Sequence, residues 1–366
     1  MSRSAAATSP LAEVRRWMAN RHVDAVYVTR PVSIGYLTGF HAEPHERLMA
    51  LAIRRDEATL IVPALEAQKA NQNAANAAVV SWRDGEDPYA LVSRVLAGMV
   101  EVGVEKDHLS LNAAEVITSR TGVSELVDVD SEIRGLRLLK HEDEIEKLAR
   151  AAAITDAAGE AALSRIRAGQ SEIEVALTIG SVIGELGGDL AFDSLVQSGP
   201  NSALPHLGPS SRKLAAGDLV LVDFGAAFDG YKADITRMAV VGEPGEQHRA
   251  IHRLVLEAHD AAIKAVRPEA TTGEVDAAAR RVIEAAGYGE HFFHRVGHGI
   301  GLEAHEDPSL DPGSQTVLEP GMVFTIEPGI YIPGFGGVRI EDDVVVEPSG
   351  CRVLTQADRS LRVIST

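Results

Sequence analysis

Short apolar runs alternate with helix-like stretches over the first third of the chain. Runs typical of buried strands lie at 25–29, 48–53, 58–62 and 79–82, with further strand-like pieces near Leu109 and Leu126. Helices are predicted between them at 10–20, 64–76 and 87–100. The first of these helices has Ser9 as a capping residue in front of a proline. This alternation predicts an α/β domain with its own core, which we assign to residues 1–132.

The pattern changes to long helical stretches after a basic join at 131–141. Helices are predicted at 142–167, 171–187, 246–266 and 274–286. Two capping-box pairs, Ser171 with Glu174 and Thr271 with Glu274, support two of these helix starts. The remainder of this half is strand-like and rich in glycine. We therefore assign residues 133–366 to a second domain and expect an α+β two-domain chain.

The segment 219–234, LVLVDFGAAFDGYKAD, is typical of a β-hairpin. Its apolar first strand leads to Asp229 and Gly230, the residue types that a tight two-residue turn requires. That turn sets the pairing of the two strands, and it predicts that Asp223 lies opposite Thr236.

With this register, Asp223 and Asp234 share one face of the hairpin as diagonal neighbours, about 7–8 Å apart at Cα. Two carboxylates on a largely apolar hairpin repel each other and lose hydration unless a cation lies between them. Hard oxygen ligands in this arrangement fit a divalent metal ion. The alternative is a pair of solvated aspartates on an exposed face.

Three histidines, His294, His298 and His305, lie in the segment HRVGHGIGLEAHE. The glycines of this segment disfavour a helix, so we expect an extended chain with backbone packed closely behind the imidazoles. A single histidine in such a segment is more often structural than functional, whereas the cluster favours a site.

Glu327 and Glu341 each follow an apolar, strand-like run. A Pro-Gly pair stops the first run, and the connection YIPGFGG leads to the second, so the two strands predict a second hairpin. An isolated glutamate at either place would be a solvated charge at a strand end. Together with Asp223, Asp234 and His298, however, they provide enough ligands for two divalent ions. This mixture of oxygen and nitrogen favours Mn, Co, Zn or Fe over Ca or Mg.

Composition narrows the range of partners. The net charge of −18 argues against DNA, RNA or an anionic membrane surface. No apolar run reaches a length of about 18–20 residues, which a membrane helix requires, and residues 1–10 lack the apolar core of a signal peptide. Cys351 is the single cysteine in 366 residues, so an intrachain disulfide is impossible and a cytoplasmic location is expected.

Several segments of the second half resemble those of the pita-bread metallopeptidases, the family of methionine aminopeptidase, aminopeptidase P and prolidase. The matching motifs, in the family's order, are Pro205-His206, VDFGAAFDGYKADITR, HRVGHGIGLEAHE, TIEPG and VRIEDD. The α/β half resembles the creatinase-like N-terminal domain of aminopeptidase P and prolidase, which methionine aminopeptidases lack. The resemblance thus implies a creatinase-like domain followed by a pita-bread domain.

The resemblance also implies a centre with two divalent metal ions. It assigns Asp223 to one ion, with Asp234 and Glu341 bridging both. It assigns His298 and Glu327 to the other ion. Mn²⁺ is the expected metal, with Co²⁺ or Zn²⁺ as alternatives. A hydroxide that bridges the ions would attack the scissile carbonyl, and Glu327 would carry its proton to the leaving nitrogen.

Four further residues match substrate-facing positions of the family. His206 and His305 are expected to contact the scissile peptide, and His294 and Arg339 to line the leaving-group side. For Arg339 the sequence leaves two interpretations: a structural pair with a carboxylate of the VRIEDD motif, or bidentate binding of a substrate carboxylate. We favour the second.

The expected activity is hydrolysis of the Xaa-Pro bond of dipeptides, as in prolidase. Aminopeptidase P action on longer proline-containing peptides is the alternative, because the sequence separates these two activities poorly. A non-peptidase hydrolase or lyase on the same fold, and a binding module that keeps only the fold, are disfavoured because every ligand position is retained. A homodimer is implied by the family alone.

Overall fold

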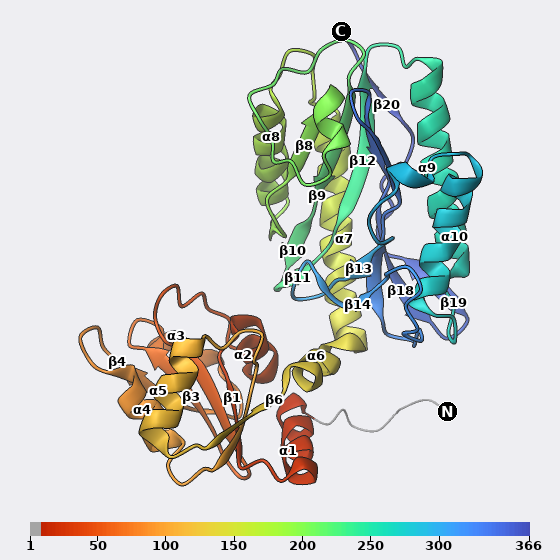
Figure 1. Cartoon of the computed structure of the whole chain (residues 1–366). Coiled ribbons are helices and arrows are strands. Elements are labelled where there is room, and N and C mark those ends of the chain that lie inside the picture. Colours follow the sequence, from red (N-terminus) through yellow and green to blue (C-terminus); the bar gives the residue numbers. More distant parts are fainter. Residues whose placement is uncertain (1–8) are drawn as a thin grey trace. The chain divides into compact units, whose positions relative to one another are not determined.

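The structure, a computed structural model, describes residues 9–366 (Figure 1). The chain divides into two compact units between Arg137 and Leu138. The domain limits expected from the sequence, 1–132 and 133–366, stay a prediction, and helix α6 (Asp130–Leu138) contains both points of division. The prediction that a signal peptide is absent rests on N-terminal residues of which 1–8 lie outside this description.

The N-terminal unit is a mixed sheet with helices packed on both faces (Figure 1). The sheet order is β4-β3-β2-β1-β5-β6, with strands β1 (Ala25–Val28), β2 (Ala50–Arg54), β3 (Ala58–Pro63), β4 (Ala78–Trp82), β5 (Glu101–Val104) and β6 (Glu125–Asp128). The helices before α6 are α1 (Pro10–Arg21), α2 (Pro31–Thr38), α3 (Ala67–Asn73), α4 (Pro88–Val95) and α5 (Leu111–Thr121). One apolar core joins α1, α2 and α6 to one face of the sheet, and a second joins α4 and α5 to the other.

The predicted α/β pattern of this unit is confirmed, with three local differences. Ser9 caps α1 as predicted. The strand predicted near Leu109 is wrong: the strand is β5, and Leu109 immediately precedes Ser110, the N-cap of α5. Helix α2 was not predicted. Most of its residues are buried, so its apolar residues do not form the one-sided stripe by which an amphipathic helix is identified. The join predicted at 131–141 is largely helix α6.

The helices of the C-terminal unit follow the predicted ranges closely. They are α7 (Glu142–Leu163), α8 (Glu172–Glu185), α9 (Glu246–Ala265) and α10 (Thr272–Ala285), with short 3₁₀ helices η1 (Gly199–Ala203) and η2 (Gly289–His291). The predicted capping boxes open α8 and α10, where Ser171 and Thr271 each exchange hydrogen bonds with the glutamate three residues later. No helix within residues 9–366 is both long and apolar enough to cross a membrane.

The predicted central hairpin is confirmed. Its strands are β9 (Leu219–Phe224), β10 (Ala226–Phe228), β11 (Tyr231–Lys232) and β12 (Ile235–Val241). Asp229 and Gly230 form the turn with φ values of 50° and 82°, and Asp223 lies opposite Thr236 as predicted. The ladder is interrupted at Gly225, where an added Cβ would lie 1.7 Å from the carbonyl oxygen of Ala233. Only glycine permits this close approach of the two strands.

Both faces of this hairpin are buried. Leu219 and Leu221 face a core shared with α9 and α10, whereas Val220 and Val222 face a core shared with α7 and α8. Figure 1 shows these helix pairs on opposite sides of the strands. Strands β7 (Asp189–Leu190), β8 (Leu195–Ser198) and β20 (Arg362–Ile364) extend the sheets around the hairpin. Packing on both sides holds Asp223 and Asp234 in place.

The second predicted hairpin is also confirmed, and it is longer than predicted. Strand β15 (Val323–Ile326) pairs with β18 (Asp342–Glu347), and β16 (Gly329–Ile332) pairs with β17 (Gly336–Arg339). The two pairs keep one register, so Glu327 lies opposite Glu341 in the interruption between them. Strands β13 (His298–Gly299), β14 (Glu306–Ser309) and β19 (Gly350–Val353) complete the larger sheet.

Candidate metal centre and active site

The interruptions of the two hairpins bring the predicted metal ligands together. Each ligand side chain lies on a strand or directly beside a strand end, where the neighbouring ladder fixes its backbone. All of them line one cavity of about 1160 Å³; they are Asp223, Asp234, His298, Glu327 and Glu341. Residues predicted from separate motifs thus converge on a single site.

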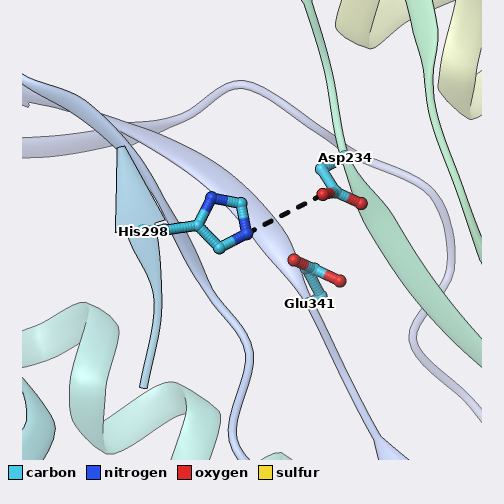
Figure 2. Close-up of side chains that lie close together, drawn as sticks. All are labelled: Asp234, His298 and Glu341. Carbon is cyan, nitrogen blue, oxygen red and sulfur yellow. Dashed lines mark ion pairs between the residues drawn. The ribbon is translucent and has the colours of Figure 1, made fainter. Parts of the chain in front are cut away.

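Asp234, His298 and Glu341 form the tightest group within this site (Figure 2). One ligand atom from each of them lies within 4.8 Å of the others. The Nε2 atom of His298 is 4.0 Å from Asp234 Oδ2 and 3.4 Å from Glu327 Oε1. The side chains point toward one another from different strand segments, an arrangement that can enclose a cation.

The carboxylates of the site are buried without enough hydrogen-bond donors. Among the described residues, the Oδ1 atoms of Asp223 and Asp234 are buried and have no hydrogen-bond partner. Burial, followed by repulsion from neighbouring carboxylates, raises the pKa values of Asp234 and Glu341 well above their usual range. Burial also raises the pKa of Glu327 to about 7. Divalent cations would supply the missing positive charge and the missing partners, so this donor set fits a metal centre.

Burial favours the neutral form of the imidazoles of His294, His298 and His305, the form that a metal ligand must have. Burial lowers the pKa of His298 to about 3 and that of His294 to about 4. The rings of His298 and His305 are 4.0 Å apart between centroids, and burial lowers the pKa of His305 as well. The extended, glycine-rich chain predicted for this segment is confirmed by β13 and by Gly297, where an added Cβ would lie 1.9 Å from the carbonyl oxygen of Thr325.

His206 lies in the loop after η1 and lines the same cavity. The amide nitrogen of Gln197, on β8, donates to the carbonyl oxygens on either side of this histidine, Pro205 at 3.1 Å and Leu207 at 2.9 Å. These two hydrogen bonds hold the loop that carries His206. Gln197 has no recognisable sequence signal, because it lies within an ordinary apolar strand.

Arg339 is held entirely by protein groups. Its side chain is buried, and its Nε donates to Thr236 Oγ1 at 2.9 Å and its NH1 to the Tyr331 hydroxyl at 3.0 Å. Its NH2 donates to Asp223 Oδ2. Of the two interpretations of Arg339, the structure contains the structural pairing: Asp223 accepts a hydrogen bond from its guanidinium, and Glu341 of the VRIEDD motif lies 4.0 Å from its Nε. Binding of a substrate carboxylate by Arg339 stays a prediction.

Tyr331, which sequence reasoning missed, connects Arg339 to His294. Because Arg339 donates to the tyrosine oxygen, the hydroxyl proton is free to point at His294 Nε2, 3.0 Å away. His294 Nδ1 then carries the proton and donates to the carbonyl oxygen of Arg295 at 2.7 Å. Both nitrogens of His294 are thus occupied, and its ring forms a fixed part of the cavity wall.

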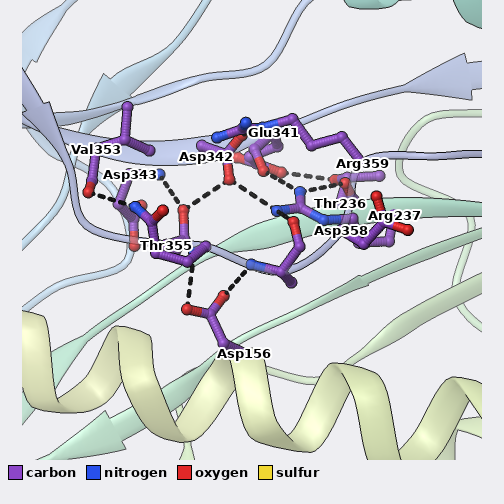
Figure 3. Close-up of polar contacts among 12 residues, drawn as sticks. Asp156, Thr236, Arg237, Glu341, Asp342, Asp343, Val353, Thr355, Asp358 and Arg359 are labelled. Carbon is purple, nitrogen blue, oxygen red and sulfur yellow. Dashed lines mark hydrogen bonds and ion pairs between the residues drawn. The ribbon is translucent and has the colours of Figure 1, made fainter.

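A buried polar network supports the backbone of two metal-ligand candidates from behind (Figure 3). Arg237 donates to the carbonyl oxygen of Glu341 at 2.6 Å and to Asp342 Oδ1 at 2.7 Å. Asp343 Oδ2 accepts the backbone N–H of Asp234 at 3.0 Å. The adjacent acidic pair in VRIEDD and the arginine in ADITR were the available sequence signals for this network.

The fold and this site define a metallopeptidase, and comparison with known proteins agrees. Residues 146–348 match metallopeptidase family M24, and residues 10–139 match the creatinase/prolidase N-terminal domain. The chain therefore belongs to metallopeptidase family M24 and carries a creatinase/prolidase N-terminal domain. The expected two-domain fold is confirmed, as is the resemblance on which it was based.

Individual relatives match almost the whole chain. An Xaa-Pro dipeptidase of Lactobacillus helveticus is 39% identical over 362 residues, covering 97% of this chain and 98% of that protein. The crystal structure of the prolidase from Pyrococcus horikoshii OT3 has a TM-score of 0.91 and 37% identity, and covers 97% of this chain and 100% of that chain. An X-Pro aminopeptidase from Thermotoga maritima MSB8 has a TM-score of 0.85 and 34% identity, and covers 94% of this chain and 98% of that chain.

Proposed function

We propose that this protein hydrolyses the Xaa-Pro bond of dipeptides, using two divalent metal ions. The observation that carries this proposal is the convergence of five ligand side chains, four of them buried and with unpaired carboxylate oxygens among them, at the wall of one cavity. The Xaa-Pro dipeptidase and prolidase relatives supply the substrate class. Retention of every ligand position opposes a non-peptidase or a purely binding role.

The ligand roles follow from the resemblance and fit the geometry. Asp223 would hold one ion, and Asp234 and Glu341 would serve as ligands to both. His298 and Glu327 would hold the other. When bound, the ions lower the pKa of a shared water and neutralise negative charge that develops on the scissile carbonyl oxygen.

The remaining residues position the substrate and move protons. Glu327 accepts the proton of the attacking water at a carboxylate oxygen and passes it to the leaving nitrogen of proline. His206 and His305, both lining the cavity, donate hydrogen bonds to the scissile peptide as its carbonyl becomes negative. His294 and Arg339 shape the leaving-group side through their shared bond to Tyr331.

Cleavage of longer peptides is the second candidate, because the cavity volume of about 1160 Å³ is larger than a dipeptide requires. The X-Pro aminopeptidase relative supports this alternative. To separate the two, the protein is stripped with chelator, supplied with Mn²⁺ and offered Leu-Pro beside Leu-Pro-Gly-Gly, with products identified by mass spectrometry. Leucine released mainly from Leu-Pro supports the dipeptidase. Release mainly from the longer peptide would replace it with the aminopeptidase, and cleavage of neither would reject both.

We also propose Mn²⁺ as the native metal, a homodimer and a cytoplasmic location. The mixed oxygen and nitrogen ligands support Mn²⁺, with Co²⁺ and Zn²⁺ as alternatives. The single cysteine supports a reducing compartment. The homodimer is supported by the family resemblance, and light scattering on the purified protein tests it directly.

A further inference from the structure

The first residue of α8, Glu172, has a fully buried carboxylate that takes no part in the chemistry proposed above. A carboxylate that leaves water is stable only where hydrogen-bond donors replace its hydration. Here the donors come from both ends of the segment 198–210. This segment contains η1 and carries His206, which lines the cavity. The carboxylate thus joins the two ends of a loop that reaches the active site.

The two carboxylate oxygens of Glu172 are bonded to opposite ends of this segment. At its start, Oε1 accepts from the backbone N–H and from the hydroxyl of Ser198, both at 2.7 Å. At its end, Oε2 accepts from the backbone N–H of Ser210 at 3.0 Å and from the hydroxyl of the same residue at 2.6 Å. Asn201 Nδ2 donates to both oxygens, at 3.0 and 3.2 Å. One side chain therefore fixes both ends of the loop.

This arrangement requires a carboxylate rather than an amide. The backbone N–H groups of Ser198 and Ser210 donate to different oxygens of Glu172, and a backbone N–H can only donate. Glutamine offers one acceptor oxygen and one NH2 group, so in either orientation of its amide one of these N–H groups meets a donor. The first turn of a helix also stabilises the negative charge of Glu172.

His206 depends on this loop for its position. Within residues 9–366 its imidazole forms no hydrogen bond, so the backbone of the loop determines where the ring lies. The residue is part of a turn closed by the hydrogen bond from the N–H of Leu207 to the carbonyl oxygen of Leu204, at 2.9 Å. Burial is the largest cause of the lowered pKa values of His294 and His305, and the charge of His206 is a further cause for both. The His206 imidazole is therefore a neighbour of the other two.

We propose that Glu172 is a positioning residue that holds His206 toward the scissile peptide by fixing both ends of its loop. This inference rests on the function proposed above, in which His206 donates a hydrogen bond to the scissile peptide. Glu172 does not touch the substrate and acts only through His206. The metal-ligand candidates lie outside the segment 198–210, so a displaced loop should lower activity without releasing metal.

The test is a double-mutant cycle of Glu172→Gln and His206→Ala in the full-length, metal-loaded enzyme. The substrate is whichever of Leu-Pro and Leu-Pro-Gly-Gly the wild type cleaves faster. Glu172→Gln should lower kcat/KM by about 10- to 100-fold, because a displacement of about 1 Å of a catalytic group has an effect of this size. In the His206→Ala background the same substitution should change kcat/KM by less than about twofold, because the group that it positions is absent. The amount of bound Mn²⁺ should be the same in all variants.

Glu174→Gln is the matched control. Glu174 lies in the same turn of α8, and its carboxylate accepts from the backbone N–H of Ser171 at 2.5 Å and from Lys213 Nζ at 2.9 Å, both outside the segment 198–210. Its replacement removes a negative charge from the start of the helix and leaves the loop bonds intact. Its kcat/KM should therefore stay within about twofold of the wild-type value.

The outcomes separate this inference from the function on which it rests. If the wild type is active and Glu172→Gln lowers kcat/KM equally in both backgrounds, Glu172 acts independently of His206, and the inference is wrong while the function stands. Wild-type activity of a folded Glu172→Gln, or loss of metal from it, would also overturn the inference. If the wild type cleaves neither peptide, both proposals fail.

A milder variant covers the case in which Glu172→Gln does not fold, as judged by circular dichroism. Ser210→Ala removes the hydroxyl that donates to Glu172 at 2.6 Å and keeps the backbone N–H at the same end of the loop. It should lower kcat/KM less than Glu172→Gln, and the loss should again disappear in the His206→Ala background. An equal loss in both backgrounds, or no loss, would overturn the positioning role.

Discussion

Replacing Glu327 with glutamine should change activity and stability in opposite directions. The carboxylate lies 3.4 Å from His298 Nε2, and its side chain is 15% exposed. The amide has the same shape but cannot take up the proton of the attacking water. General acid–base groups contribute about 10²–10⁴-fold to rate, so hydrolysis of Leu-Pro should fall by a factor in this range.

The stability effect follows from the pKa of the same group. Burial raises the folded-state pKa of Glu327 from 4.5 to about 7. Between these values the folded, metal-free protein holds a proton that the unfolded chain has released, so stability decreases as the pH rises through this interval. Each pKa unit corresponds to about 1.4 kcal/mol, and the full effect is about 3 kcal/mol. Glu327→Gln removes this pH-dependent loss of stability, because the amide does not titrate.

The assay uses chelator-treated protein and urea unfolding at pH 5 and pH 8, with Leu-Pro hydrolysis measured separately after metal is restored. Glu327→Gln should exceed the wild type in stability at pH 8 and differ little at pH 5. Asp193→Asn, which changes an exposed carboxylate at the same cavity, should leave the pH dependence of stability unaltered. Near-normal turnover of a metal-loaded Glu327→Gln would refute the proton-transfer role. Lower stability of this variant at pH 8 would refute the electrostatic reasoning.

Three further perturbations test the supporting structure. Arg237→Met removes the buried ion pair with Asp342 at 2.7 Å, while His259 and Arg359 still contact that carboxylate. The free energy of unfolding measured in urea should fall by about 2–3 kcal/mol, and an unchanged value would contradict the supporting role of this pair. Tyr331→Phe removes the oxygen that accepts from Arg339, and it should cost about 1–3 kcal/mol by the same measurement, with no loss expected if that bond is unimportant. Chelation should lower Tm reversibly. The free energy of unfolding should fall by about 2.7 kcal/mol for each metal site that was occupied at a metal concentration one hundred times its Kd. A Tm that does not respond to metal would argue against a metal centre.

Local sequence signals account for the parts of the fold that could be predicted. Asp229 and Gly230 can form one kind of turn, and because strand pairing continues from a turn residue by residue, the position of Asp223 followed from it. The capping boxes similarly fixed the starts of α8 and α10. The metal-ligand candidates lie in motifs that are far apart in the chain. Their convergence on one site was predicted from the family resemblance, because periodicity alone does not relate distant segments.

Contacts between distant segments account for what could not be predicted. The carboxylate that is hydrogen-bonded to Arg339 is Asp223 on β9, far from it in sequence, whereas Glu341, two residues further along the chain, lies 4.0 Å from its Nε. Gln197 and Tyr331 lie in ordinary strand segments, and their roles arise from hydrogen bonds across the site. The misplaced strand near Leu109 reflects a different difficulty: β5 is only the short segment EVGV, and an apolar residue ahead of a helix produces a similar signal.

The measurement that tests the metal-dependent function most directly is a titration of Mn²⁺ into chelator-stripped protein, with bound metal and Leu-Pro hydrolysis determined in the same samples. The proposed function predicts no hydrolysis without metal and full hydrolysis as binding approaches two ions per chain. Asp234→Asn, which alters a carboxylate proposed as a ligand to both ions, should reduce metal binding and activity together. Hydrolysis that persists in the stripped protein, or Asp234→Asn that binds metal and turns over like the wild type, would contradict the proposed centre.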